Sequence, residues 1–176
     1  MSVGGLLGNE DLLDLAKKKD CKIYLPSGAL AGLDGVKSAS VGRIDSITLT
    51  TRKPPEGLKG APYIIRNKID LDAIIKETVI FEGSANEAVE GFPKNINVSA
   101  ALSLAGIGAE KTRVRIIADP NLKRNIHEVE VKGEFGRLVS RTENLPSPKN
   151  PKTSYLACLS AIATLKGIVS SIKIGT

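Results

Sequence analysis

The chain contains a single histidine, His127, in the segment ADPNLKRNIHEVEV (118–131), between an Asp-Pro turn and an alternating, strand-like run. An imidazole titrates near neutral pH, so it can take or give a proton during a reaction. A lone histidine near the start of a strand is also a common surface or half-buried residue with one satisfied hydrogen bond. By position alone, His127 is therefore both a candidate acid–base group and a candidate structural residue.

The basic residues could bind an anionic ligand, because 25 Lys and Arg stand against 19 Asp and Glu and give a formal net charge of +6. They are scattered through segments such as AKKKDCK, TTRKPP and NLKRN, and aromatic residues make up only 3% of the chain. A nucleic-acid-binding protein would more often show a concentrated basic patch with interleaved aromatic side chains. We therefore expect no nucleic-acid partner, and the charge fits a small anionic ligand.

The two cysteines, Cys21 and Cys158, lie far apart and match no metal-ligand spacing, so we expect no metal site and no disulfide. Isolated thiols of this kind are typical of a reducing compartment. The start MSVGGLLGNEDLL lacks the basic residues of a signal peptide, and Lys166 interrupts the longest apolar run. We therefore expect a cytoplasmic protein without a membrane span.

The elements that must position these residues follow from apolar periodicity and from breaker residues. Helices are expected at residues 9–19, within 26–40, and at 84–92, 95–108 and 154–169. Strands are expected at residues 22–25, 44–52, 78–84 and 112–119, with a hairpin over 127–144 that turns near 133–136 and loops at 53–62 and 146–154.

Several of these helices carry recognisable start signals. Asn9 is a candidate cap for the first helix, and Ser84 with Glu87 has the spacing of a capping box. Ser154 or Thr153 is expected to cap the final helix. The arrangement predicts an α+β fold in which helices cover one face of a mixed or largely antiparallel sheet, with an aliphatic core.

One glycine-rich stretch, GIGAEK (106–111), superficially resembles a dinucleotide-binding fingerprint. Lys111 stands where the third glycine should be, and the stretch ends a helix and precedes a strand. The fingerprint requires the reverse order, from strand to helix. This stretch is therefore not expected to bind a nucleotide.

Five further segments occur in an order that identifies a family: LPSGALAGLDGVKSA, KPP, FEGSANEAVEGFPKNINVSAALSLAGIG, ADPNLKRNIHEVEV and ENLPSPKNPKTSYLACLSAI. Together they resemble the L-aspartate dehydrogenases of archaea and bacteria across nearly the whole chain. The resemblance implies NAD(P)-dependent oxidation of L-aspartate to iminoaspartate, a precursor of quinolinate in NAD biosynthesis. It also implies a Rossmann domain followed by an α+β domain that forms the substrate site and the oligomer interface.

The same resemblance implies a division of this chain. Residues 1–25 resemble the late part of the Rossmann domain, and residues 26–176 resemble the catalytic and oligomerisation domain of an N-terminally truncated enzyme. The final helix is expected to pack back on the nucleotide domain, and the protein is expected to form a homo-oligomer, a dimer. An alternative is a non-catalytic ligand-binding or oligomerisation domain that keeps the fold and lacks the cofactor-binding half.

The resemblance also gives roles to three residues. His127 matches the catalytic histidine of the family, which suits a reaction that must deprotonate the substrate ammonium before a C=N bond can form. Asn97 matches a position on the nicotinamide side of the cofactor, NAD or NADP, although it could instead cap its own helix. Asn95 is the better candidate for that cap. Gly5 stands where the family has an alanine at the cofactor.

A substrate with two carboxylates needs cationic or backbone N–H partners. The start of the helix within 26–40 can offer backbone amides, and four basic residues are candidate cations, each of which could equally be a solvated surface charge. The candidate substrate-binding residues are Ser27, Gly28, Ala29, Arg52, Lys53, Lys149 and Lys152. Nothing in the sequence chooses between NAD and NADP.

Overall fold

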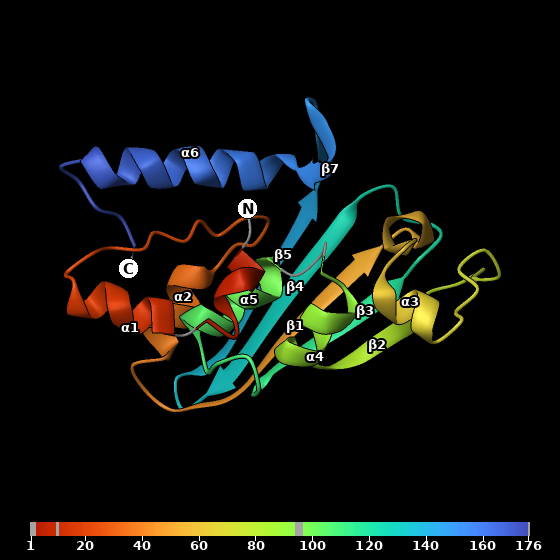
Figure 1. Ribbon diagram of the computed structural model, residues 1–176, viewed down its shortest axis with the longest axis horizontal. Coiled ribbons are helices and arrows are strands. Elements are labelled where there is room, and N and C mark those ends of the chain that lie inside the picture. Colours follow the sequence, from red (N-terminus) through yellow and green to blue (C-terminus); the bar gives the residue numbers. More distant parts are fainter. Residues whose placement is uncertain (1–2, 10, 94–96, 176) are drawn as a thin grey trace.

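The computed structural model describes residues 3–9, 11–93 and 97–175, and for residues 151 and 152 the backbone only (Figure 1). Its centre is a five-stranded sheet in the order β2-β3-β1-β4-β5, in which β1 and β3 are parallel and the other neighbours are antiparallel. The strands are β1 (Ile44–Lys53), β2 (Thr78–Ser84), β3 (Thr112–Ala118), β4 (Asn125–Gly133) and β5 (Gly136–Asn144).

Helices α2 to α5 lie over one face of this sheet, and α6 starts at β7, beyond the end of β5, and runs toward the side of the molecule where α1 and α2 lie (Figure 1). The predicted α+β class and mixed sheet are therefore confirmed. The helices are α1 (Asp11–Lys18), α2 (Leu33–Ala39), α3 (Pro62–Arg66), α4 (Ala85–Gly91), α5 (Asn97–Ala105) and α6 (Tyr155–Val169), with short 3-10 turns η1 (Val3–Leu6) and η2 (Pro55–Leu58). A small hairpin, β6 (Pro146–Ser147) and β7 (Asn150–Ser154), precedes α6.

The alternation of β1 decides which of its side chains enter the core. Ile47, Leu49, Thr51 and Lys53 point toward the helices and are all buried, since alternate residues of a strand share one face. Leu49 and Ile47 pack with aliphatic side chains of β3, β4 and α5 in one continuous cluster. Thr51 and Lys53 therefore continue the buried face of β1 beyond the aliphatic core, so their positions are fixed by packing.

Helix α4 begins at the capping box that the sequence predicts. The Glu87 backbone N–H donates to Ser84 Oγ at 3.2 Å, and the Ser84 backbone N–H donates to Glu87 Oε2 at 2.7 Å. These bonds satisfy backbone N–H groups at the helix start that have no acceptor within the helix. The junction of β2 and α4 is thereby fixed.

The predicted strand at residues 22–25 is wrong. The segment has no regular secondary structure and pairs with no strand, and Ile23 and Tyr24 are 43% and 48% exposed. A short apolar run becomes a strand only where a sheet edge offers it hydrogen-bond partners, and this run lies outside the sheet. Within the described part of residues 3–25, η1 and α1 are present without any strand, so the Rossmann assignment of this segment stays a prediction.

The start of α6 also differs from the expectation. Ser154 does occupy the position before the helix, but its Oγ donates to Asn144 Oδ1 at 2.7 Å and makes no capping bond. Residues 146–154, expected to be a loop, contain the β6–β7 hairpin. In the described part of the chain, no helix combines the length and apolar character needed to cross a bilayer.

Candidate active site

His127 lies on β4 and is buried, with 5% of its surface exposed. The strand register places it directly opposite Thr51 of β1 on one side and Thr142 of β5 on the other. Thr51 Oγ1 and His127 Nδ1 are hydrogen-bonded at 3.0 Å. Because this bond occupies Nδ1, Nε2 is the ring nitrogen left to meet a ligand.

Burial lowers the pKa of His127 to about 3, and the positive charge of Lys53 adds to the effect. Desolvation disfavours the charged form of a group, and a neighbouring cation disfavours a second positive charge. The imidazole is therefore neutral at physiological pH and carries a lone pair. In this state it can accept a hydrogen bond from a bound substrate, and the near-neutral titration expected of an ordinary imidazole does not hold for His127 in this environment.

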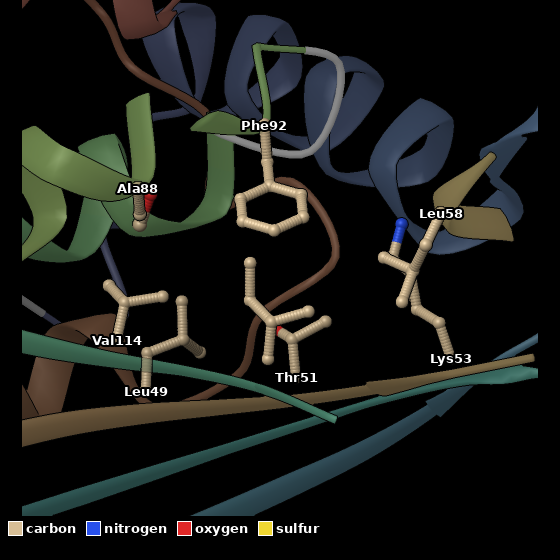
Figure 2. Close-up of a pocket in the computed structure, with 9 residues that line it drawn as sticks. Leu49, Thr51, Lys53, Leu58, Ala88, Phe92 and Val114 are labelled. Carbon is tan, nitrogen blue, oxygen red and sulfur yellow. The ribbon is translucent and has the colours of Figure 1, made fainter. Parts of the chain in front are cut away.

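Lys53 is the last residue of β1 and shares the face of Thr51 and His127. It is only 8% exposed, and burial lowers its pKa to about 8. Because Arg52 is the register partner of Ile126, Lys53 lies diagonally next to His127 on the sheet. Figure 2 shows its side chain rising from β1 toward Leu58, beside Thr51. A buried lysine and a buried histidine thus lie side by side at the end of the sheet.

Lys53 lies between two spaces of different character. Toward α4 and α5 is a small pocket of about 10 Å³, enough for about one water molecule (Figure 2). On the other side an open cleft of about 500 Å³ extends to the β6–β7 hairpin. Its charged or amide-bearing lining residues are Lys53, Glu56, Lys59, Lys123, Arg124, Asn125 and Asn144. The cleft can hold a small molecule and carries more basic than acidic side chains.

The sequence analysis did not single out Lys59, Lys123 or Arg124 as site residues. Lys59 forms ion pairs with Glu56 at 2.9 Å and Asp72 at 3.0 Å. Lys123 and Arg124 could have been predicted as site residues from their position in NLKRN, directly before the strand that carries His127. A loop that enters such a strand opens at the same end of the sheet as the histidine.

A buried polar network joins β5 to the loop before α2. Thr142 Oγ1 donates to the Ala29 carbonyl at 2.8 Å, and Asn144 Nδ2 donates to the same carbonyl at 3.2 Å. Asn144 in turn accepts the bond from Ser154. Since Thr142 is the register partner of His127, the network ties the Ala29 carbonyl to the strand position next to the histidine.

The predicted substrate-binding residues have different locations. Lys53 lines the cleft, whereas Arg52 points to the opposite face of the sheet and pairs with Glu77 at 3.6 Å. The Gly28 N–H already donates to Ser160 Oγ of α6 at 3.0 Å. Lys149 is exposed at the turn between β6 and β7. Lys152 lies on β7, and its side chain is outside the described part of the structure.

The two predicted cofactor contacts are brought close together. The Gly4 N–H donates to Asn97 Oδ1 at 3.4 Å, so η1, which contains Gly5, lies against the start of α5. A Cβ added at Gly5 would meet nothing within 4 Å, so open space lies beside it. Ser99, two residues after Asn97, lines the small pocket with Thr51 and Lys53. Asn95, the alternative cap, lies outside the described residues.

These contacts fit one end of a pyridine nucleotide. The Asn97 amide can both donate and accept, as a carboxamide or a ribose requires. The open space at Gly5 leaves room beside that amide. Metal ligation has no comparable basis, because no group of three or more His, Cys, Asp or Glu side chains converges within residues 3–9, 11–93 and 97–175.

Together the fold and the site define an α+β domain in which a buried histidine lies near a buried lysine that lines a cleft with more basic than acidic side chains. A family model described as "Aspartate dehydrogenase, C-terminal" matches residues 34–168. The chain therefore belongs to the aspartate dehydrogenase C-terminal domain family.

Individual relatives agree with this assignment. An L-aspartate dehydrogenase of Methanosarcina mazei is 59% identical over 100% of this chain and 66% of its own length. An L-aspartate dehydrogenase of Bradyrhizobium diazoefficiens is 49% identical over 100% of this chain and 62% of its own. The crystal structure of aspartate dehydrogenase from Thermotoga maritima, 30% identical, superposes with a TM-score of 0.80 over 99% of this chain and 66% of that one. The chain thus spans just under two thirds of the length of these relatives.

Proposed function

We propose that the protein containing this chain oxidises L-aspartate to iminoaspartate with NAD or NADP as hydride acceptor, and that His127 is its acid–base group. The observation that carries the proposal is the buried His127–Thr51 pair beside a cationic cleft, in a domain of this family. The relatives named L-aspartate dehydrogenase support the same reaction.

The chemistry assigns a task to His127. Aspartate arrives as an ammonium, and its nitrogen must lose a proton before its lone pair can form the C=N bond. A neutral imidazole whose Nδ1 is held by Thr51 can receive that proton at Nε2. The Thr51 hydroxyl can accept from Nδ1–H or donate to a bare Nδ1, and the proposed reaction uses the first arrangement, in which Nε2 carries the lone pair.

The two substrate carboxylates would lie in the cationic cleft and against the loop of Ser27 to Ala29. Among the four candidate cations, Lys53 has the strongest support because it lines the cleft next to His127. Arg52 has the weakest support as a carboxylate-binding residue, since its side chain lies on the opposite face of the sheet and pairs with Glu77. Carboxylates in this space would interact favourably with its excess of basic side chains.

Asn97 and the backbone at Gly5 would hold the nicotinamide end of the cofactor. When bound, the cofactor accepts the hydride that leaves the substrate Cα. The Asn97 amide orients the carboxamide or ribose, and the small residue at position 5 leaves space beside it. In this proposal Asn97 and Gly5 serve the same role, where η1 lies against the start of α5.

The remaining proposals concern the whole protein. Its product, iminoaspartate, would serve as a precursor of quinolinate in NAD biosynthesis. We infer a cytoplasmic homodimer with no nucleic-acid partner, in which residues 26–176 form the catalytic and oligomerisation domain. Residues 1–25 would belong to the nucleotide-binding domain, and the exposed apolar side chains of α6 would pack against it, among them Leu159, Ile162 and Leu165.

The test is aspartate-dependent reduction of NAD or NADP by the complete gene product containing this chain. We expect turnover with L-aspartate and none with L-malate, which has no amine. His127→Ala should lower kcat by about 100-fold or more, as loss of an acid–base group does, whereas the remote control Lys111→Met should leave it unchanged. Binding of aspartate without turnover would support the non-catalytic alternative and refute the proposal.

A further inference from the structure

We propose that Lys53 is the group on which the substrate proton finally resides, and that His127 passes the proton to it. This inference rests on the proposed function and assigns a second proton-transfer residue to the same site. In this scheme His127 contacts the substrate amine, and Lys53 acts through His127.

The first reason is the placement of Lys53. Lysine is rarely buried, because taking its charge out of water is costly. Lys53 is nevertheless 8% exposed and projects into the space between β1 and η2 (Figure 2). The cost is reduced when the amine is neutral, which is the form that can accept a proton.

The second reason is the proximity of Lys53 to His127. The two side chains are diagonal neighbours on one face of β1 and β4, and the Lys53 charge acts on the ionisation of His127. Protonating one of them therefore disfavours protonating the other. A proton transferred to this pair should therefore reside on Lys53, because burial lowers the pKa of His127 to about 3 and that of Lys53 only to about 8.

The third reason is the charge of the surroundings. The charged residues that line the cleft with Lys53 are Glu56 of η2, Lys59 directly after it, and Lys123 and Arg124 from the loop before β4. On β4, His127 is the titratable group that the Lys53 charge affects. The pocket residues from α4, the segment after it and α5, which are Ala88, Phe92 and Ser99, carry no charge. The lowering of the Lys53 pKa comes from burial. The two carboxylates of a substrate entering this cleft would favour the protonated form of Lys53, so proton uptake by Lys53 and carboxylate binding support each other.

The substrate R–NH3⁺ and neutral Lys53 give R–NH2 and protonated Lys53. His127 Nε2 takes the proton from the substrate nitrogen and gives the same proton to Lys53 Nζ, while Nδ1–H remains bonded to Thr51 Oγ1. The freed lone pair then forms the C=N bond while the Cα–H bond breaks and its electron pair leaves as hydride to the pyridine nucleotide. His127 is unchanged at the end.

The experiment compares three substitutions at Lys53 in the complete gene product containing this chain. Lys53→Arg keeps a cation but cannot accept a proton near neutral pH. We expect it to lower kcat about 100-fold or more, with KM for aspartate changed less than about threefold, and to abolish the rise of kcat with pH. Lys53→Met should lower kcat to a similar extent. Lys53→Ala should regain activity when ethylamine is added, because the free amine can replace the missing side-chain amine as proton acceptor. Lys111→Met, an exposed lysine at the opposite end of β3, is the matched control.

If Lys53 only binds a carboxylate, Lys53→Arg will retain kcat and the pH profile, and Lys53→Met will raise KM; that result overturns the inference. A wild-type protein without aspartate oxidation would instead refute the proposed function.

A second measurement needs neither a variant nor turnover. In the chain labelled with [ε-¹³C]lysine, one resonance should titrate near pH 8 and move to higher pH when succinate is added. Titration of every lysine at its ordinary value of about 10.4 would contradict the inference even if no Lys53 variant folds.

Discussion

Replacing His127 with glutamine should remove most of the acid sensitivity of this fold between pH 7 and pH 5. Burial lowers the pKa of His127 in the folded chain to about 3, whereas an unfolded histidine ionises near its ordinary value of about 6.5. Below that value the unfolded chain binds a proton that the folded chain does not, so the free energy of unfolding falls as the pH falls. The glutamine amide can still hydrogen-bond to Thr51 and does not titrate.

The size of the effect follows from the two pKa values. Between pH 7 and pH 5 the unfolded state gains most of one proton while the folded state gains almost none, which costs about 2 kcal/mol of stability. This figure is insensitive to how far below pH 4 the folded pKa lies. The chain has 1 histidine, so no second imidazole contributes in this window. The carboxylates of Glu87 and Glu130 have lowered pKa values and titrate below it.

The assay is urea unfolding of the wild-type chain and His127→Gln at both pH values. The wild-type chain should lose about 2 kcal/mol more than the variant, which corresponds to about 4–8 °C in Tm for a domain of this size. Equal losses in the two proteins would refute the argument, because they would mean that His127 ionises in the folded state much as it does in the unfolded one.

Three further perturbations test other parts of the structure. Because burial lowers the Lys53 pKa from 10.5 to about 8, the unfolding free energy should rise by about 3 kcal/mol between those pH values, and Lys53→Met should lack this rise in denaturant titrations. Asn144→Ala removes the buried amide that ties β5 to Ala29 and should lower the free energy of unfolding by about 2 kcal/mol in thermal unfolding. The control Asn121→Ala, at an exposed position, should leave the Tm unchanged, and equal Tm values for the two variants would contradict the role of this network. Ser84→Ala removes the α4 cap and should cost about 1 kcal/mol by the same assay, and a neutral result would discount the capping box.

Much of the fold could be predicted from local patterns. Apolar alternation located β1, β2 and β3 to within one residue at each end, and the capping box located the start of α4. The hairpin glycines, Gly133 and Gly136, gave the turn between β4 and β5. These signals are local, because each is read from neighbours along the chain. The strand predicted at residues 22–25 is wrong for the same reason. A strand needs a hydrogen-bonding partner strand, and the local sequence does not specify one.

The site was predictable only in part. His127 was identifiable from its residue type and family motif, but its partners depend on register between strands far apart in sequence. That Lys53 faces His127 while Arg52 faces away follows from the alternation of β1 once its buried face is known. Nothing local indicates that Thr51 lies opposite His127, or that Thr142 and Asn144 hold the Ala29 carbonyl. Burial, which sets the ionisation of His127 and Lys53, is a property of the assembled layers.

The central claim is that this site removes hydride from the α-carbon of aspartate. The most direct measurement supplies L-[2-²H]aspartate and the oxidised nucleotide to the complete gene product and analyses the reduced nucleotide by mass spectrometry. The account predicts that the reduced nucleotide carries deuterium with the wild-type protein and that His127→Ala forms about 100-fold less of it. Reduced nucleotide without deuterium, or none at all from the wild-type protein, would contradict it.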